Sequence, residues 1–227
     1  MGLGLSGVKG ISLEGLDAIR HADVVFLELY TSIMPEFSLK ELKELSGKEI
    51  ITLKRRDLED LSGRFLLEKA KDKKVVLLTP GDPLIATTHI SIRLLAEKMG
   101  IATRVIHAAS VLSAAISASG LYCYKFGKIV TITTNSEAPY DVLKGNMERG
   151  LHTLFLLDID VERGYYMSVP EALDTLLSIE NKRKECVLSS STLAVVLSRI
   201  GSSSHTIKCD RISNLLTMHF GFPPHVI

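Results

Sequence analysis

Short apolar runs alternate with helix-forming segments through the first hundred residues of this 227-residue chain. The apolar runs are strand-like in length and rich in aliphatic side chains: residues 23–28, 49–53, 75–78 and 103–107. The segments between them place apolar side chains at helical spacing: residues 12–21, 39–45, 58–70 and 89–99. Neighbouring parallel strands need a crossover connection, which is usually a helix, so this alternation predicts a mostly parallel sheet. Ser12 is the expected N-cap of the first helix.

The pattern changes after residue 108. Further helices are expected over residues 108–118, 140–149, 170–179 and 212–216, with Pro170 at a natural first-turn position. Strand-like runs lie at residues 128–133, 152–157, 193–197, 206–209 and 224–227. The larger share of strands indicates a second, mixed sheet. The chain is therefore predicted to form two α/β domains, residues 1–109 and residues 110–227.

A loop with two prolines follows the apolar run at residues 75–78. Pro80 and Pro83 fix φ and remove two backbone donors, so this loop has a preset shape. Gly81 lets a ligand approach the main chain, and Asp82 offers acceptor oxygens. Open α/β sheets bind ligands at the carboxyl ends of their strands, where this loop lies. Asp82 is thus either a ligand-binding residue or a local cap of a proline-rich turn.

The sequence also contains a literal G-x-G-x-x-G, from Gly2 to Gly7. Glu28 follows 21 residues after Gly7, much as an acidic residue follows the glycines of a dinucleotide-binding fold. An NAD-binding dehydrogenase is therefore an alternative function. However, the motif should follow a strand, and only Met1 precedes it. A helix should also open at the third glycine, whereas residues 8–10 intervene before Ser12, so the context disfavours this alternative.

Composition excludes several other classes of function. The chain has 27 Lys and Arg against 26 Asp and Glu, so no basic footprint for nucleic acid appears. Three scattered cysteines and seven dispersed histidines form no metal-binding motif, and the cysteine usage is typical of a reducing compartment. No apolar run approaches the ~20 residues needed to span a bilayer, and no signal peptide is recognisable. We therefore expect a cytoplasmic protein that binds neither nucleic acid nor membrane and holds no metal.

A series of motifs appears in order from one end of the chain to the other. The glycine loop and the proline loop belong to this series, as does the Ala-Thr-Thr-His sequence that ends at His89. The remaining segments are residues 22–28, 30–32, 105–110, 124–127, 148–153, 157–159, 220–221 and 223–225. Together they resemble the tetrapyrrole (class III) methyltransferase family, whose members use S-adenosylmethionine. The specific motifs resemble the branch that acts in diphthamide biosynthesis.

The resemblance implies two α/β domains of the tetrapyrrole methylase type with S-adenosylmethionine in the cleft between them, and a homodimer. Carried over position by position, it implies the following cofactor-binding residues: Leu5, Asp82, Ile85, Ser110, Val111, Leu157, Ile200 and His225. For each aliphatic member of this set, an ordinary core position is the simpler interpretation. The implied reaction is successive methylation of the amino group on the modified histidine of elongation factor 2. No catalytic residue is assigned, because in-line methyl transfer relies mainly on positioning and desolvation.

Two differences from the family pattern lead to further expectations. The family has an apolar strand ahead of the glycine loop and a strand-forming stretch beyond Pro-Pro-His, whereas this sequence begins at Met1 and stops at Ile227. Either the chain is a short family member or its termini are incomplete. In both cases we expect changes at the central strand of the first sheet and at an edge of the second, in a C-terminal domain shortened at its end. A precorrin-type tetrapyrrole is the alternative substrate, although an anionic macrocycle favours a basic cleft that a net charge of +1 does not indicate.

Overall fold

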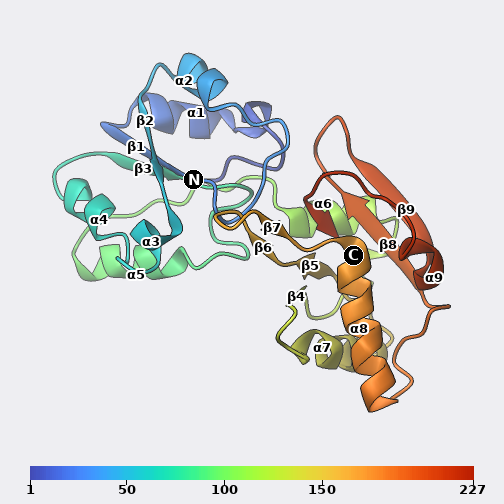
Figure 1. The fold of residues 1–227 in the computed structure, drawn as a ribbon. Coiled ribbons are helices and arrows are strands. Elements are labelled where there is room, and N and C mark those ends of the chain that lie inside the picture. The colour runs from blue at the N-terminus through green and yellow to red at the C-terminus, as the bar shows by residue number, and fades with distance from the viewer. The chain divides into compact units, whose positions relative to one another are not determined.

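The computed structural model describes residues 1–227 as two compact units, Met1–Val111 (unit 1) and Leu112–Ile227 (unit 2). Figure 1 shows that each unit combines a β-sheet with helices. No helix is long and apolar enough to cross a membrane. The prediction of an α/β protein with one parallel and one mixed sheet is confirmed.

Unit 1 is built on a parallel sheet of three strands in the order β2-β1-β3. Its strands are β1 (Val24–Glu28), β2 (Ile50–Leu53) and β3 (Val75–Leu78). Phe26 of the central strand pairs with Ile51 on one side and Leu77 on the other. Because β1 is covered on both faces, it reads as a continuous apolar run rather than an alternating one.

Helices cover both faces of this sheet (Figure 1). They are α1 (Leu13–Arg20), α2 (Leu39–Ser46), α3 (Arg55–Leu58), α4 (Arg64–Ala70) and α5 (Ile90–Lys98), with a 3₁₀ turn at Val8–Gly10. The Ser12 side chain accepts a hydrogen bond from the Gly15 N–H, which confirms its predicted role as an N-cap. Successive β1 side chains point to opposite faces, so Val25 packs in the core under α1 and α2 and Phe26 in the core under α3 to α5.

Two predictions for unit 1 are wrong in detail. The helix expected over residues 58–70 is divided into α3 and α4, since Ser62 and Gly63 both have positive φ, at 53° and 64°. The strand expected at residues 103–107 is absent, and this stretch has no regular secondary structure. Its one ladder-like bond joins the Ile106 carbonyl to the Gly2 N–H at 3.0 Å. A strand needs a neighbour along its whole length, and residues 103–105 have none.

Residues 1–3 occupy the position beside β3. Gly2 forms a parallel bridge with Thr79, and Leu3 is fully buried. The first sheet therefore extends by one short stretch beyond β3.

Unit 2 contains a mixed sheet of five strands in the order β4-β5-β10-β8-β9. Its strands are β4 (Val130–Ile132), β5 (Phe155–Leu157), β8 (Leu193–Ser198), β9 (Thr206–Arg211) and β10 (His225–Val226). A small hairpin joins β6 (Ile159–Asp160) to β7 (Tyr165–Tyr166). Only β4 and β5 are parallel neighbours. The last residues of the sequence thus form an inner strand. The main chains of Phe155 and Ile227 each donate a hydrogen bond to the other.

The helices of unit 2 are α6 (Val111–Ala118), α7 (Ala138–Met147), α8 (Val169–Arg183) and α9 (Ile212–Leu215), with a 3₁₀ turn at Cys123–Lys125. α8 starts at a capping box between Ser168 and Glu171, and Pro170 lies in its first turn as predicted. α8 extends to Arg183 rather than residue 179, because no breaking residue follows Ile179. Its buried side chains form one core with α7, α9 and the sheet.

Candidate functional site

The turn after β3 is organised around the carboxylate of Asp82. Its Oδ1 accepts a hydrogen bond from the Leu84 N–H at 3.1 Å. Its Oδ2 accepts one from the Ala108 N–H at 3.3 Å and lies 2.8 Å from Nδ1 of His107. The role of a local cap is therefore present in the structure. A carboxylate has about four lone-pair positions, so Oδ1 keeps one free for a further donor.

The charge of Asp82 is stabilised where it lies. Burial raises the pKa of this carboxyl, but the hydrogen bonds from Leu84, His107 and Ala108 outweigh that effect and hold the pKa below its usual range. Asp82 as a whole is 6 % exposed. Asp82 is consequently a nearly buried anion at neutral pH, in a turn at the carboxyl end of a parallel strand, which is where open α/β sheets bind ligands.

The glycine loop packs directly against this turn. Gly4 and Gly81 exchange main-chain hydrogen bonds of 3.3 and 2.8 Å, and both residues have positive φ. A Cβ atom at Gly2 would lie 2.3 Å from the Gly81 carbonyl oxygen and 2.7 Å from Cβ of Ala108. These glycines therefore allow the backbone segments around Gly2, Gly81 and Ala108 to pack closely against one another.

This arrangement does not match a dinucleotide-binding loop. Only a 3₁₀ turn follows Gly7, and α1 begins at Leu13. The Glu28 side chain is fully buried. Its Oε2 accepts hydrogen bonds from the N–H groups of Tyr30 and Thr31, both at 3.1 Å, and its Oε1 accepts one from the Thr31 hydroxyl at 2.6 Å. Glu28 is therefore not placed to bind a ribose, and the dehydrogenase alternative is not supported.

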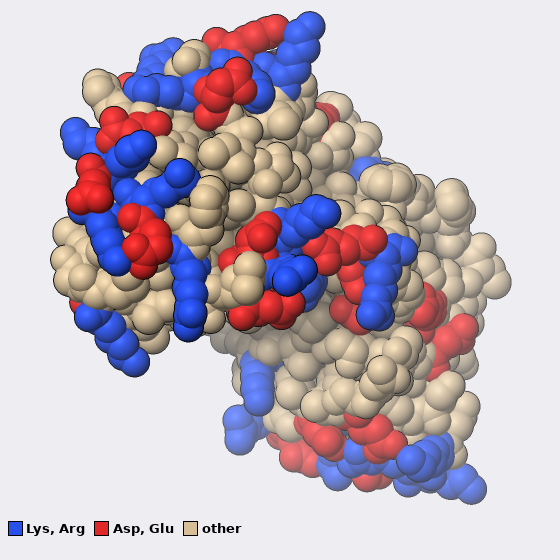
Figure 2. All heavy atoms as spheres, turned by 60° about the vertical axis from the view of Figure 1, so that its left-hand side comes forward, with Lys and Arg blue, Asp and Glu red and all other residues tan.

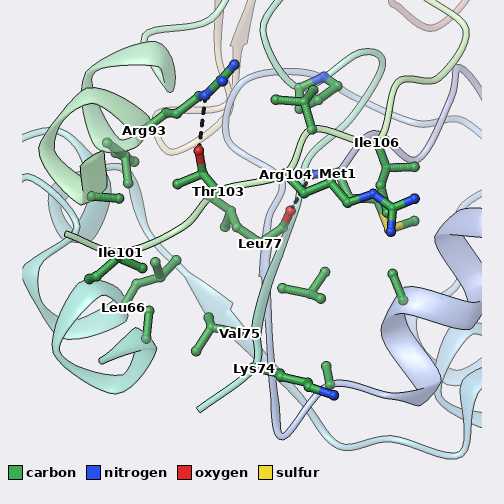
Figure 3. A pocket seen from close by; sticks show the side chains of 18 of the residues that line it. Met1, Leu66, Lys74, Val75, Leu77, Arg93, Ile101, Thr103, Arg104 and Ile106 are labelled. Atoms are coloured by element: carbon green, nitrogen blue, oxygen red, sulfur yellow. Dashed lines mark hydrogen bonds between the residues drawn. The ribbon is translucent and has the colours of Figure 1, made fainter. Parts of the chain in front are cut away.

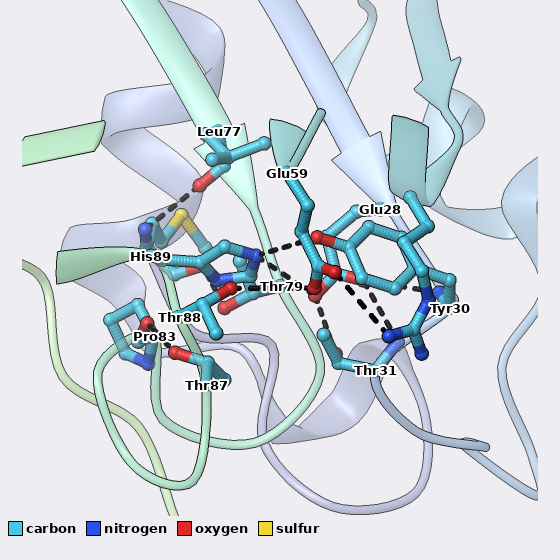
Figure 4. A network of polar contacts seen from close by, with 12 residues as sticks. Glu28, Tyr30, Thr31, Glu59, Leu77, Thr79, Pro83, Thr87, Thr88 and His89 are labelled. Carbon is cyan, nitrogen blue, oxygen red and sulfur yellow. Dashed lines mark hydrogen bonds and ion pairs between the residues drawn. The ribbon is translucent and has the colours of Figure 1, made fainter. Parts of the chain in front are cut away.

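Glu28 belongs instead to a buried polar network at the carboxyl ends of the strands (Figure 4). Nε2 of His89 lies 4.0 Å from Oε1 of Glu28 and 3.4 Å from the Tyr30 hydroxyl. Burial raises the pKa of Glu28 to about 6 and lowers the pKa of His89 to about 4, so the imidazole is neutral at pH 7. This network ties the loop after β1 to the loop after β3. Sequence reasoning singled out both segments without predicting that they meet.

The other predicted site residues of unit 1 lie on the loops around Asp82. Leu5 directly follows Gly4, and the Ile85 N–H donates to the Asp82 carbonyl at 3.4 Å. The Ile85 side chain is 40 % exposed, so it is available to a ligand. Ser110 and Val111 are half-buried and follow shortly after Ala108, which contacts Asp82. The fold thus places four of the five predicted residues of this unit on loops and the fifth, Val111, at the first position of α6.

The three predicted residues of unit 2 gather where β5, β10 and β8 lie side by side. Val226 pairs with Leu156, which places His225 opposite Leu157 at the end of β5. His225 also pairs with Ser198 of β8, and Ile200 follows two residues later. Although histidines near a chain end are usually solvated, His225 is only 7 % exposed, because β10 is an inner strand.

His225 is held as a neutral side chain. Its Nδ1 lies 2.9 Å from the Ser198 hydroxyl, which is fully buried. Burial, with a smaller contribution from the charge of Arg199, lowers the pKa of His225 to about 4. Arg199 in turn donates from Nη1 to the Phe220 carbonyl at 2.8 Å and so orders the segment before β10. Sequence reasoning missed the supporting roles of Ser198, Arg199 and His107, although His107 lies within a quoted motif.

Charged groups are mixed over the surface. Figure 2 shows Lys and Arg interspersed with Asp and Glu on the face in view. No group of three or more His, Cys, Asp or Glu side chains is arranged to hold a metal ion. A sizeable basic surface for an anionic macrocycle is therefore not visible on this face.

Comparison with known proteins gives the class of protein. The family model described as tetrapyrrole (corrin/porphyrin) methylases matches residues 1–209, and the chain belongs to this family. Diphthine synthases are among its relatives. The protein from Methanocella arvoryzae is 46% identical over 232 residues, covering 100% of this chain and 90% of the relative. The protein from Archaeoglobus fulgidus is 43% identical over 228 residues, covering 100% of this chain and 86% of the relative.

The solved structures agree with this placement. A crystal structure of diphthine synthase superposes with a TM-score of 0.89 at 42% identity, covering 99% of this chain and 86% of that one. Within the tetrapyrrole methylases the chain groups with the diphthine synthases, so it is a methyltransferase that uses S-adenosylmethionine. The predicted family, cofactor and enzyme class are confirmed.

Proposed function

We propose that this chain transfers methyl groups from S-adenosylmethionine to the amino group on the modified histidine of elongation factor 2. The observation that carries the proposal is identity of 41–46% to diphthine synthases along the full length of the chain. The reaction is a step of diphthamide biosynthesis, and repetition on the same amine yields its trimethylammonium form.

The residues of unit 1 fit a cationic cofactor. When bound, S-adenosylmethionine supplies a methyl group activated by a sulfonium centre. Asp82 is charged and keeps one free lone pair on Oδ1, so it can accept a hydrogen bond from a ribose hydroxyl or an ammonium group. Leu5 follows Gly4, which is hydrogen-bonded to Gly81, and the Ile85 N–H donates to the Asp82 carbonyl. Ser110 directly precedes Val111, the first residue of α6. This combination of one anion with aliphatic surface suits the mixed polarity of the ligand.

The residues of unit 2 suit the same ligand because His225 carries no positive charge. A protonated imidazole would repel a sulfonium, whereas the pKa of His225 near 4 keeps its ring neutral. Ile200 is half-buried, and Leu157, which lies opposite His225, is buried in the core of unit 2. We propose that Leu157, Ile200 and His225 are the cofactor-binding residues of unit 2.

The chemistry asks little more of the protein than placement. The attacking amine must arrive neutral and in line with the methyl group, in surroundings that exclude water, because charge is dispersed in the transition state. We assign no general base. Near the proposed site, the titratable groups Asp82 and His225 are held in the forms that favour binding rather than proton transfer.

We further propose that the enzyme works in the cytoplasm as a homodimer. Cys123, Cys186 and Cys209 are all free and exposed, which suits a reducing compartment. Sedimentation equilibrium over a range of protein concentrations tests the oligomeric state. A mass of one chain at every concentration contradicts the dimer.

The decisive experiment offers labelled S-adenosylmethionine and two acceptors. One acceptor is elongation factor 2 that carries the aminocarboxypropyl intermediate, and the matched control is the same factor without it. We expect label in the modified factor alone. Label in a precorrin but never in the protein would overturn the assignment. A binding titration with S-adenosylhomocysteine and with NAD completes the test, since only the former should saturate.

A further inference from the structure

Three consecutive cations follow β2 in unit 1. They are Lys54, Arg55 and Arg56. Glu28 at the end of β1 pairs with Leu53 at the end of β2, and β3 runs parallel to β1 on its other side. The carboxyl ends of all three strands therefore lie at one edge of the sheet, and this edge also carries the Asp82 turn.

Arg55 is the cation of this group that is held in place by other side chains. The carbon of its guanidinium lies 5.1 Å from the centre of the Tyr30 ring, and Tyr30 is itself buried. Its Nη1 lies 3.4 Å from Oε2 of Glu59. The Arg55 side chain is still 40 % exposed, so a ligand can reach it. Because a guanidinium has five N–H donors in a planar fork, it can bind a carboxylate alongside these contacts.

The loop that carries Asp82 also reaches the pair formed by Arg55 and Glu59. The Thr88 hydroxyl, near the end of this loop, donates to Oε1 of Glu59 at 3.4 Å. Figure 4 shows Tyr30, Glu59 and Thr88 gathered from the segments that follow β1, β2 and β3. One loop of unit 1 therefore connects Asp82, which we propose binds the cofactor, with the place where Arg55 is held.

Two other arginines of unit 1 have different surroundings. Arg93 and Arg104 line an apolar cavity beside β3 (Figure 3). Arg93 forms an ion pair with Glu97, and Arg104 forms one with Glu14. Of these three arginines, Arg55 alone contacts a residue of the loop after β1.

The acceptor of the proposed function carries its reacting amine and a carboxylate on the same carbon atom. Each transfer makes the amine larger, and the third leaves it permanently charged, whereas the carboxylate stays the same throughout. A site that methylates one amine repeatedly therefore needs a contact with the part that does not change. The planar fork of an arginine binds a carboxylate through two parallel hydrogen bonds.

The charges around Arg55 suit a group that carries both signs. Glu59 and the buried Glu28 lie near the guanidinium, so the cluster is not purely positive. Both oxygens of Glu28 already accept hydrogen bonds from Tyr30 and Thr31. An amino acid group, with its amine and its carboxylate, matches this mixture of charges better than a plain anion does.

We propose that Arg55 binds the carboxylate of the aminocarboxypropyl group and so presents its amine to the methyl donor. Tyr30 and Glu59 are positioning residues, because they hold the guanidinium from two sides. This inference rests on the proposed function and names the residue that recognises the acceptor.

A pair of small ligands tests the proposal without depending on turnover. One is the free amino acid in which an imidazole ring carries the aminocarboxypropyl chain, and the other is the amine that has hydrogen in place of its carboxyl group. Both are titrated by NMR into the 227-residue chain saturated with S-adenosylhomocysteine. We expect the amino acid to bind with a Kd of roughly 0.1–5 mM. It should bind at least about tenfold more tightly than the amine, the scale of a hydrogen bond between charged groups.

Variants of neighbouring arginines locate the contact. In Arg55→Gln the preference for the amino acid should fall below about threefold. Arg55→Lys should restore part of it, since lysine keeps the charge but not the planar fork. Arg56→Gln is the matched control, because Arg56 is exposed and adjacent in sequence, and it should keep the wild-type preference. The Kd of S-adenosylhomocysteine reports an intact fold and should stay within about twofold in every variant.

Methylation assays separate this inference from the proposed function. With elongation factor 2 that carries the intermediate, Arg55→Gln should raise KM at least about tenfold. An unchanged KM would overturn the inference alone, as would equal binding of the two small ligands by the wild type or an equal loss of both in Arg55→Gln. A wild type that prefers the amino acid through Arg55 but never labels the factor would overturn the proposed function alone.

Discussion

Asp82 in unit 1 and His225 in unit 2 are both nearly buried polar side chains, yet their surroundings set opposite charge states. Two main-chain N–H groups and His107 surround the Asp82 carboxylate, and its pKa falls so that it stays charged. His225 has one hydroxyl partner and a nearby arginine, and its pKa falls to about 4 so that it stays neutral. Whether a buried group keeps its charge is thus decided by the number and kind of partners rather than by burial alone.

The largest test of this comparison is the pH dependence of unfolding. The pKa of His225 is about 4 in the folded state against 6.5 for a free histidine. Its neutral form is therefore favoured by folding, so its contribution is complete above pH 6.5 and is lost as pH falls toward 4. The total is about 3 kcal/mol. Urea unfolding between pH 7 and pH 4 should show a smaller loss for His225→Gln than for the wild type.

His205→Gln is the matched control, because His205 is exposed. It should retain the pH dependence of the wild type. If the free energy of unfolding falls equally with pH in the wild type and in His225→Gln, then His225 is not held neutral by burial. Asp82 contributes in the same direction but at lower pH: its lowered pKa adds stability that is present above pH 3.8 and disappears as pH falls further.

The next test displaces the Asp82 turn without removing the carboxylate. Gly2→Ala places a methyl group within 2.3 Å of the Gly81 carbonyl oxygen, which must move. We expect a loss of about 2 kcal/mol in the free energy of unfolding, as for other overpacked sites, measured by urea denaturation. Gly145→Ala is the control. Gly145 lies in α7 with nothing within 4 Å of the added atom, so that change should stabilise the protein by about 0.5–1 kcal/mol.

Removing the charge of Asp82 should have a smaller effect, which is measured on cofactor binding. Asp82→Ala should weaken S-adenosylhomocysteine binding at least about tenfold, or ~1.4 kcal/mol, the scale of a hydrogen bond to a charged group. Calorimetry on Asp82→Asn separates the two roles of this residue, because asparagine keeps one acceptor for Leu84 and loses the charge. Unchanged affinity in both variants would remove Asp82 from the cofactor site.

The smallest expected effect concerns the partner of His225. Ser198→Ala removes the hydroxyl 2.9 Å from Nδ1 and leaves a buried nitrogen unpaired. The cost should be about 1 kcal/mol in thermal or urea unfolding. Ser190→Ala, on an exposed turn, is the comparison variant. If both variants unfold alike, the Ser198 hydroxyl does not contribute to holding His225.

Local patterns were sufficient for elements that depend on nearby residues. The Ser12 cap, the aliphatic strand β3 and the proline-led start of α8 follow from side chains within a few positions of each other. Prediction of secondary structure was less accurate where contacts with residues distant in sequence determine the conformation. Residues 103–107 have strand-like composition but lack a continuous partner, and the helical pattern of residues 58–70 continues through a turn with positive φ.

The sequence alone determined the family, the methyl donor and the alternation that produces a parallel sheet, because ordered motifs and apolar spacing are readable without contacts. Only the tertiary structure decided that Glu28 is fully buried in a network with His89, and that His225 is an inner-strand residue held neutral. It also decided that the Asp82 carboxylate is already partly used by Leu84 and Ala108. The reason is physical: charge state and availability depend on solvent exclusion and on donors that come from remote parts of the chain.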